Sequence, residues 1–307
     1  MKGMVIKSTG SWYSVLVDDG QVYPARLRGK FKIKGLKVTN PVAVGDQVEI
    51  KEENDEENTA VITEILPREN YIIRKSTRKA HHGHILAANI DQAVLIATLV
   101  FPRTSLGFID RFLVSAESFR IPALLVFNKS DLLDEDQQEL QAAIMDLYER
   151  VGYPCLSISA LDTEDIRQLQ EQLVDKVSLF SGHSGVGKST ILNQVHPDIQ
   201  QKTSEVSTFA NKGVHTTTYA EMFQIDHQTF VIDTPGIKEL GLMDINEGEL
   251  RDYFPEMRAL LGECKFYDCT HVHEPDCAVR KAVEANEIAE SRYYNYLSML
   301  EDEDSYR

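Results

Sequence analysis

Long apolar runs are missing from this 307-residue chain. No segment approaches the ~18–20 consecutive apolar residues that a membrane-spanning helix needs. The opening MKGMVIKSTGSWYSV also lacks an apolar signal-peptide core and a small-residue cleavage site. These absences predict a cytoplasmic protein without a membrane partner. The length suffices for two or three domains.

Cysteine is scarce, with four in the chain, which is too few for a disulfide scaffold. Three of them, Cys264, Cys269 and Cys277, lie close together and predict a metal site instead. Cys155 stands apart at the mouth of an apolar strand. There a small buried hydrophobe is a better interpretation than a nucleophile.

Positive charge is outnumbered, since 32 Lys and Arg face 48 Asp and Glu for a formal net charge of −16. This balance argues against a protein that coats nucleic acid through its overall field. Basic residues nevertheless gather at 24–38 and 72–84, whereas acids gather at 51–58 and 301–304. The segregation indicates an oriented contact with an anionic partner, with ordinary solvated loops as the alternative.

The hydrophobic pattern divides the chain into three parts. Residues 1–67 hold short strands separated by Gly and Asp turns, which predicts a small closed β-barrel of the OB type. OB barrels often bind RNA, but the fold alone does not establish that. Residues 68–242 alternate apolar strands with helical segments, which predicts an α/β domain with a mostly parallel sheet covered on both faces. Residues 243–307 combine a cysteine and histidine cluster with a long helical stretch from 278 onward, predicting a mostly helical metal-binding domain.

The expected barrel strands lie at 4–9, 12–18, 22–28, 47–53 and 59–66. The strand segments expected in the α/β domain lie at 92–100, 122–131, 154–160, 177–181, 217–226 and 228–236, and its helices lie near 106–120, at 134–151 and near 162–175. Ligands of such sheets bind at the carboxyl ends of the strands. The motifs below all follow strands in this way.

A phosphate-binding loop is predicted at 182–189, where GHSGVGKS matches G-x-x-x-x-G-K-[ST] after a strand and before a helix. Glycines let the backbone amides turn inward around phosphates, Lys188 would reach the β- and γ-phosphates, and Ser189 would ligate Mg²⁺. The residues expected to hold the nucleotide here are Gly182, His183, Ser184, Gly185, Val186, Gly187, Lys188, Ser189 and Thr190.

Two further segments would complete the γ-phosphate site. DTPG at 233–236 follows an apolar strand, so Asp233 would hold Mg²⁺ through water and the Gly236 amide would sense the γ-phosphate. In GVHTTT at 213–218, Thr216 or Thr217 would close over the γ-phosphate as an ordered switch. His215 is a candidate to orient water, with a structural or solvated histidine as the alternative.

NKSD at 128–131 predicts guanine selectivity. Asp131 would accept two hydrogen bonds from guanine and reject adenine, because the mismatch leaves buried polar groups unpaired. Asn128 and Lys129, with Ser130 beside them, would brace the base and the loop; a simple helix N-cap is the alternative. The backbone of Ser159 and Ala160, in the SISA segment, could contact guanine O6.

The pattern C-x4-C-x-H-x5-C supplies Cys264, Cys269, His271 and Cys277. Three thiolates and one imidazole form a closed tetrahedral zinc set, whose role is structural. Unligated buried cysteines are the alternative. His273 is a spare histidine that would point to the opposite side of an extended backbone.

NKSD, SISA, GHSGVGKS, GVHTTT and DTPG stand in the order four, five, one, two, three of the usual GTPase motifs. In this order they resemble the circularly permuted GTPases. With a barrel before them and a cysteine cluster behind, the whole chain resembles the ribosome small-subunit-dependent GTPase A (RsgA) family.

The resemblance implies GTP hydrolysis to GDP during late maturation of the small (30S) ribosomal subunit, stimulated by that subunit. It implies Mg²⁺, one structural Zn²⁺ with His271 favoured as its ligand, and rRNA contacts by both outer domains of a monomeric protein. Ile237 stands where many GTPases keep a water-orienting glutamine, which predicts slow intrinsic turnover. The resemblance assigns part of that role to His215.

Two other functions fit the same residues. The protein could be an RNA-binding chaperone or checkpoint factor in which GTP mainly controls release. It could also be a metal-dependent nucleotide hydrolase without an RNA partner. The late position of the phosphate loop is explained by permutation, because the helix at 162–175 runs directly into the strand at 177–181. The chain after DTPG then leads to the cysteine cluster, so the nucleotide state could move the C-terminal domain.

Overall fold

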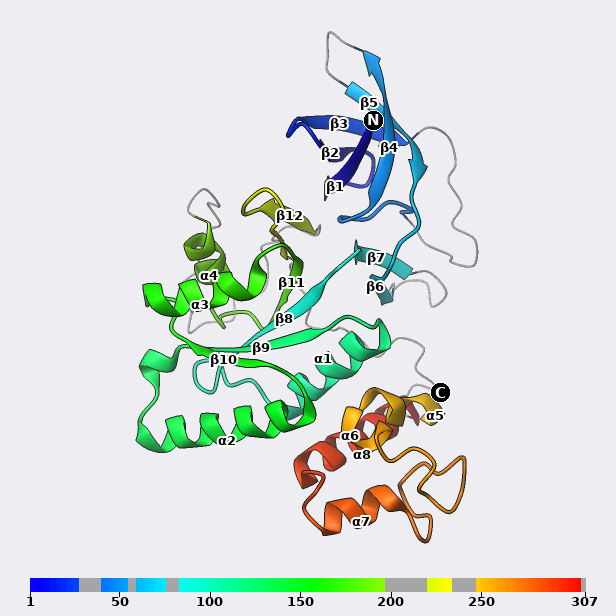
Figure 1. Ribbon diagram of the computed structural model, residues 1–307, viewed down its shortest axis with the longest axis vertical. Helices are drawn as coiled ribbons and strands as arrows, with labels where there is room; N and C mark the ends of the chain where they lie inside the picture. Colours follow the sequence, from blue (N-terminus) through cyan, green and yellow to red (C-terminus); the bar gives the residue numbers. More distant parts are fainter. Residues whose placement is uncertain (28–39, 55–58, 76–82, 197–219, 234–246, 305–307) are drawn as a thin grey trace.

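The structure is a computed structural model that describes residues 1–27, 40–54, 59–75, 83–196, 220–233 and 247–304 (Figure 1). The expected switch residues His215, Thr216 and Thr217 lie outside the described residues, as do Gly236 and Ile237. So do most of the basic segment at 24–38 and part of the one at 72–84. No helix in the described ranges is long and apolar enough to cross a membrane.

The first five strands form a closed barrel. They are β1 (Lys2–Ser8), β2 (Tyr13–Val17), β3 (Val22–Leu27), β4 (Gln47–Asn54) and β5 (Thr59–Ile65). Their order is β1-β2-β3-β5-β4, and pairing of β1 with β4 closes the ring. Alternate side chains such as Val5, Val15 and Ile62 fill the interior and are fully buried. The expected barrel is therefore confirmed, with each strand within a few residues of its predicted place.

The α/β strands are hydrogen-bonded to the barrel and continue its sheet. They are β8 (Gln92–Ala97), β9 (Ala123–Asn128), β10 (Cys155–Ile158), β11 (Val177–Ser181), β12 (Glu221–Gln224) and β13 (Phe230–Asp233). The order is β10-β9-β8-β11-β13-β12, parallel except for β12. Strand β12 pairs with β13 on one side and with β1 of the barrel on the other, at Lys7 and Glu221, whose side chains form an ion pair of 2.7 Å.

Helices cover both faces of this sheet, as expected for apolar parallel strands. The helices are α1 (Leu106–Ser118), α2 (Glu135–Val151), α3 (Thr163–Leu173) and α4 (Lys188–Val195). Side chains of β8 alternate between the two faces. Leu95 belongs to the core under α1 and α2, whereas Val94 and Ile96 belong to the core under α3 and α4. The α/β architecture predicted from the apolar runs is confirmed.

A hairpin that the sequence analysis did not predict joins the barrel to the α/β sheet (Figure 1). It consists of β6 (Tyr71–Lys75) and β7 (Gly83–Ala88). The amide of Ala88 donates to the Val44 carbonyl at 2.9 Å. Gly45 has a φ of +88°, and a Cβ there would lie 2.0 Å from the Ala88 carbonyl oxygen. The approach of the hairpin to the barrel therefore requires glycine at this position.

The C-terminal part is helical, but its last stretch is not continuous. It contains α5 (Glu247–Leu250), a 3-10 turn at Arg251–Tyr253, α6 (Pro255–Arg258), α7 (Ala278–Glu284) and α8 (Glu290–Asp304). The expected long helical stretch from 278 breaks at Asn286, which has a φ of +59°. The Glu287 amide then donates to the Ala282 carbonyl at 2.9 Å, which is a Schellman-type helix end.

Candidate nucleotide site and metal centre

The loop between β11 and α4 has the conformation that phosphate-binding loops use. Gly182, Gly185 and Gly187 all have positive φ, at +146°, +87° and +99°. A Cβ on Gly187 would lie 2.3 Å from Asn128 Nδ2, and one on Gly182 would lie 2.3 Å from the Ile96 carbonyl oxygen. These two positions exclude a side chain on steric grounds as well as by their backbone angles.

Lys188 curls back over this loop. Its Nζ donates to the carbonyl oxygens of Gly182 at 2.6 Å and His183 at 2.9 Å. Burial lowers the pKa of Lys188, and the charge of Asp233 partly offsets that effect. A buried ammonium group is stabilised by a nearby anion, so a bound phosphate would favour the charged form of this lysine.

Asn128 ties three of the predicted motifs together. Its Nδ2 donates to the Val186 carbonyl at 2.8 Å, and its Oδ1 accepts from the Ala160 amide at 3.0 Å. The neighbouring Lys129 Nζ donates to the Gly185 carbonyl at 2.8 Å. The NKSD, SISA and GHSGVGKS segments therefore meet at one end of the sheet, as their positions after parallel strands predict.

The candidate guanine-binding residues are arranged less simply. Asp131 is exposed on the 3-10 turn Ser130–Leu132 and lines a pocket of about 430 Å³ together with Ser130 and Ser157. The Ala160 amide already donates to Asn128, and the Ser159 amide donates to Asp165 at 2.6 Å. A contact of either amide with guanine O6 would share or replace these bonds.

The magnesium candidates lie on neighbouring elements. Ser189 is in the first turn of α4, directly after the loop. Asp233 ends β13, where it is in register with Phe180 of β11. Because β11 leads into the loop, parallel pairing brings Asp233 to the same edge of the sheet as Ser189. The other γ-phosphate candidates lie outside the described residues.

The four candidate zinc ligands converge. One ligand atom from each of Cys264, Cys269, His271 and Cys277 lies within 4.8 Å of the others. His271 Nδ1 is 3.3 Å from Cys277 Sγ and 3.6 Å from Cys264 Sγ, and the two sulfurs are 4.0 Å apart. Zinc–ligand bonds of ~2.0–2.3 Å give a tetrahedron with edges of about 3.3–3.8 Å. The donor set fits Zn²⁺, and both distances from His271 fall within this range, whereas the sulfur–sulfur distance is slightly wider.

A metal bound here would have to displace protons from buried thiols. Burial raises the pKa of the Cys269 thiol to about 12 and raises that of Cys277. Three thiolates this close repel one another unless a metal compensates their charge. His271 is buried, whereas His273 is exposed. Of the two histidines, the structure therefore brings only His271 to the cysteines.

Glu274 shapes the loop that carries His271, and the sequence analysis missed it. Its carboxylate accepts from the amides of Thr270, Val272 and His273 and from the Thr270 hydroxyl. Burial alone would raise the pKa of Glu274, but these hydrogen bonds outweigh it and lower the pKa to about 2. Tyr293 and Tyr296 of α8 each donate at 2.6 Å to a carbonyl of the same loop. A Glu three residues after a candidate ligand is a signal that could have been noticed.

A buried ion cluster, also missed by the sequence analysis, holds the C-terminal helices on the α/β domain. Asp110 of α1 is fully buried. It accepts hydrogen bonds from Arg292 (2.6 Å) and Asn295 (2.5 Å) of α8 and from Tyr148 (2.8 Å) of α2. Arg292 also donates to Glu256 of α6 at 2.7 and 3.0 Å. We call Asp110, Tyr148, Glu256, Arg292 and Asn295 the Asp110 cluster.

Comparisons with known proteins agree with this architecture. The family model described as RsgA GTPase matches residues 65–243, and that of the RsgA N-terminal domain matches residues 2–62. The small ribosomal subunit biogenesis GTPase RsgA of Bacteroides fragilis is 52% identical over 304 residues, covering 99% of this chain and 97% of the relative. The protein of the same name from Cytophaga hutchinsonii is 51% identical over 307 residues, covering both chains fully.

Two solved structures are similar over nearly the whole chain. YjeQ from Thermotoga maritima superposes with a TM-score of 0.78 at 36% identity, covering 98% of this chain and 97% of the other. YloQ, described as a circularly permuted GTPase, has a TM-score of 0.77 at 30% identity, covering 100% and 96%. The fold, the order of the motifs and these matches agree: this chain belongs to the RsgA family of circularly permuted GTPases and is a GTP-hydrolysing enzyme.

Proposed function

We propose that this protein hydrolyses GTP as a switch in late maturation of the small ribosomal subunit, binding rRNA and being stimulated by the subunit. The supporting observation is the convergence on Asn128, which joins the guanine motif to the phosphate loop and to the SISA segment. The relatives from Bacteroides fragilis and Cytophaga hutchinsonii carry small ribosomal subunit biogenesis in their names. Work on bacterial subunits would place the protein in the cytoplasm.

In this proposal the loop 182–190 holds the GTP or GDP phosphates, Lys188 neutralises charge on the β- and γ-phosphates, and Ser189 and Asp233 hold Mg²⁺. Asp131 selects guanine. Cys264, Cys269, His271 and Cys277 hold one structural Zn²⁺. Thr216, Thr217, His215 and Gly236 keep the roles predicted from the sequence.

We assign one function to each of the three domains predicted from the sequence. Residues 1–67 form an RNA-binding barrel, 68–242 the GTPase domain and 243–307 the zinc domain of a protein that acts as a monomer. Ile237 lacks the amide of a water-orienting glutamine, so turnover by the isolated protein is slow and the subunit supplies the acceleration.

The direct test measures GTP turnover with and without purified small subunits. We expect a low basal rate and a large increase with small subunits, but not with large subunits as the matched control. Rapid turnover that small subunits leave unchanged would contradict the switch. If a variant that cannot hydrolyse GTP still binds subunits normally and supports their maturation, the RNA chaperone is favoured instead. Weak, salt-insensitive binding to subunits would favour a nucleotide hydrolase without an RNA partner.

Replacing Asp131 with asparagine tests the guanine assignment. We expect GTP affinity to fall by about a hundredfold, because the charged acceptor is lost and the NH2 group of asparagine would face the 2-amino donor of guanine. Affinity for xanthosine triphosphate should rise, because xanthine offers an acceptor where guanine has its 2-amino donor. Competition binding with both nucleotides measures the change. Asp136→Asn, in the first turn of α2, is the matched control; unchanged GTP affinity in Asp131→Asn would refute the assignment.

A further inference from the structure

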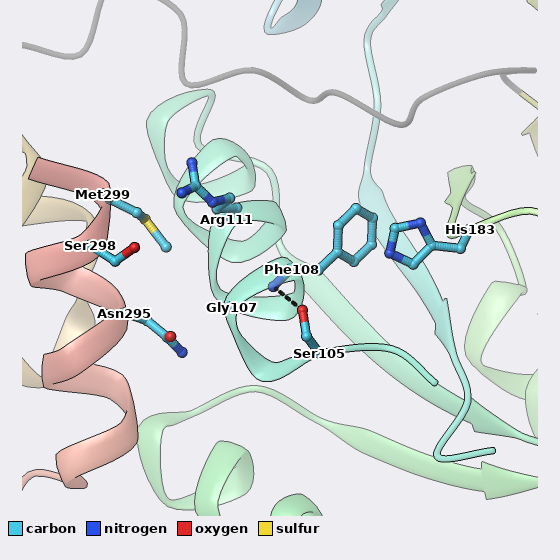
Figure 2. Close-up of a pocket in the computed structure, with 8 residues that line it drawn as sticks. All are labelled: Ser105, Gly107, Phe108, Arg111, His183, Asn295, Ser298 and Met299. Atoms are coloured by element: carbon cyan, nitrogen blue, oxygen red, sulfur yellow. Dashed lines mark hydrogen bonds between the residues drawn. The ribbon is translucent and has the colours of Figure 1, made fainter. Parts of the chain in front are cut away.

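Helix α1 lies between the phosphate loop and the C-terminal helix α8. Figure 2 shows His183 of the loop on one side of α1 and Asn295, Ser298 and Met299 of α8 on the other. A pocket of about 300 Å³ is lined by residues from all three elements, including Phe108 and Arg111 of α1. The first two turns of α1 therefore contact both the phosphate loop and α8.

On the loop side, the contact is a close pair of tilted rings. The Phe108 and His183 rings lie 3.8 Å apart between centroids, at an interplanar angle of 31° (Figure 2). The backbone of Phe108 is fixed in turn, because its amide donates to Ser105 Oγ, the N-cap of α1, at 3.2 Å. The carbonyl of His183 accepts from Lys188 Nζ at 2.9 Å. Phe108 thus holds the residue that anchors the phosphate-binding lysine.

On the other side, α8 is fixed to the same two turns. Asp110, two residues after Phe108, receives Arg292 and Asn295 in the Asp110 cluster. A Cβ on Gly107 would lie 3.4 Å from Asn295 Oδ1, so α8 passes directly over the start of α1. Val114, one turn further along α1, is fully buried in the core formed by the C-terminal helices. The position of α1 therefore depends on how α8 is docked.

We propose that Phe108 is a positioning residue of the phosphate loop and that α8, docked through the Asp110 cluster, sets its position, so that nucleotide binding and docking of the zinc unit are coupled through α1. The coupling rests on the phosphate-loop function proposed above. The coupling is reciprocal by thermodynamic linkage. A change that weakens docking of α8 lowers nucleotide affinity, and bound nucleotide strengthens docking of α8. This route is independent of the chain connection that follows DTPG.

The first arm of the test measures GDP affinity of the isolated, zinc-loaded protein with a fluorescent GDP analogue. Phe108→Ala and Phe108→Leu should weaken binding by about two- to tenfold, the range expected for loss of an aromatic pair. Phe108→Tyr keeps the ring and should restore near wild-type affinity. Phe119→Ala is the matched control, because Phe119 ends the same helix and packs on Tyr71, with ring centroids 6.0 Å apart.

The second arm loosens the α8 contact. Asn295→Ala and the milder Val114→Ala should each weaken GDP binding at least about twofold. When either is combined with Phe108→Ala, the fold loss of GDP affinity should be smaller than the product of the two separate fold losses. Tyr294→Ala is the control, since Tyr294 is 70% exposed on α8. Thermal unfolding and zinc content of every variant show that it is folded.

The outcomes separate cleanly. If Phe108→Ala lowers the melting temperature but leaves GDP affinity unchanged, Phe108 is merely structural and the inference is wrong. If folded, zinc-loaded Val114→Ala and Asn295→Ala bind GDP as wild type does, or if their effects multiply fully with that of Phe108→Ala, α8 is not coupled to the loop. A wild type that binds no guanine nucleotide would instead contradict the proposed function itself.

Discussion

Replacing Lys188 with alanine lowers the kcat for GTP hydrolysis by a factor of at least about 10²–10³, the range expected when one preorganised electrostatic contact to a transition state is removed. The Lys188 cation is held over the loop by the carbonyls of Gly182 and His183. It therefore meets developing charge on the phosphates without reorganising. Phosphate release at saturating GTP and saturating small subunits measures the loss.

Lys176→Ala is the matched control for this experiment. Lys176 stands just before β11, at the opposite end of the strand from the phosphate loop, and its Nζ donates to the Gln172 carbonyl at 2.9 Å. Its removal should leave kcat unchanged. Retention of activity by Lys188→Ala, or an equal loss in both variants, would show that the loop at 182–190 is not where GTP is hydrolysed.

Removing zinc should unfold the C-terminal unit as a whole. Structural zinc contributes an apparent ~10–16 kcal/mol in small zinc domains, which is comparable with the ~5–15 kcal/mol by which whole native proteins are stable. We expect one zinc per chain in the wild type by elemental analysis and none in Cys277→Ser. The loop 264–277 and α7, whose N-cap is Cys277, should then become sensitive to trypsin, which lowers the yield of intact protein.

The two histidines supply an internal control. His271→Ala should lose the zinc, because Nδ1 of His271 faces the cysteine sulfurs. His273→Ala should keep it, because His273 is exposed. Cys155→Ser should also keep the zinc, since the Cys155 thiol is within hydrogen-bonding distance of the Met145 and Tyr153 carbonyls and is not among the clustered zinc ligands. A zinc content that falls in His273→Ala and not in His271→Ala would overturn the proposed ligand set.

Local patterns made much of the fold predictable. Apolar runs with period two or none place the strands. The helices expected at 134–151 and 162–175 start within a residue of their predicted places, where Asp134 and Asp162 are the N-caps. These signals act over a few residues, where backbone hydrogen bonding and side-chain direction decide the outcome. The break at Asn286 also has a local signal, because asparagine tolerates the left-handed conformation at a helix end. It was hidden by the helix-forming residues around it.

Sequence alone predicts the phosphate loop, the guanine motif and the four candidate zinc ligands, because each lies within one short segment, and it shows the permuted order of these motifs along the chain. Tertiary structure alone shows that Asn128 bridges to Val186 and Ala160, that the hairpin of β6 and β7 closes on Gly45, and that Asp110 receives Arg292 from 182 positions away. Such contacts leave no periodic trace in the chain. They exist because a buried polar group must find a partner wherever the fold brings one within reach, and that choice is made only when the sheets and helices have packed.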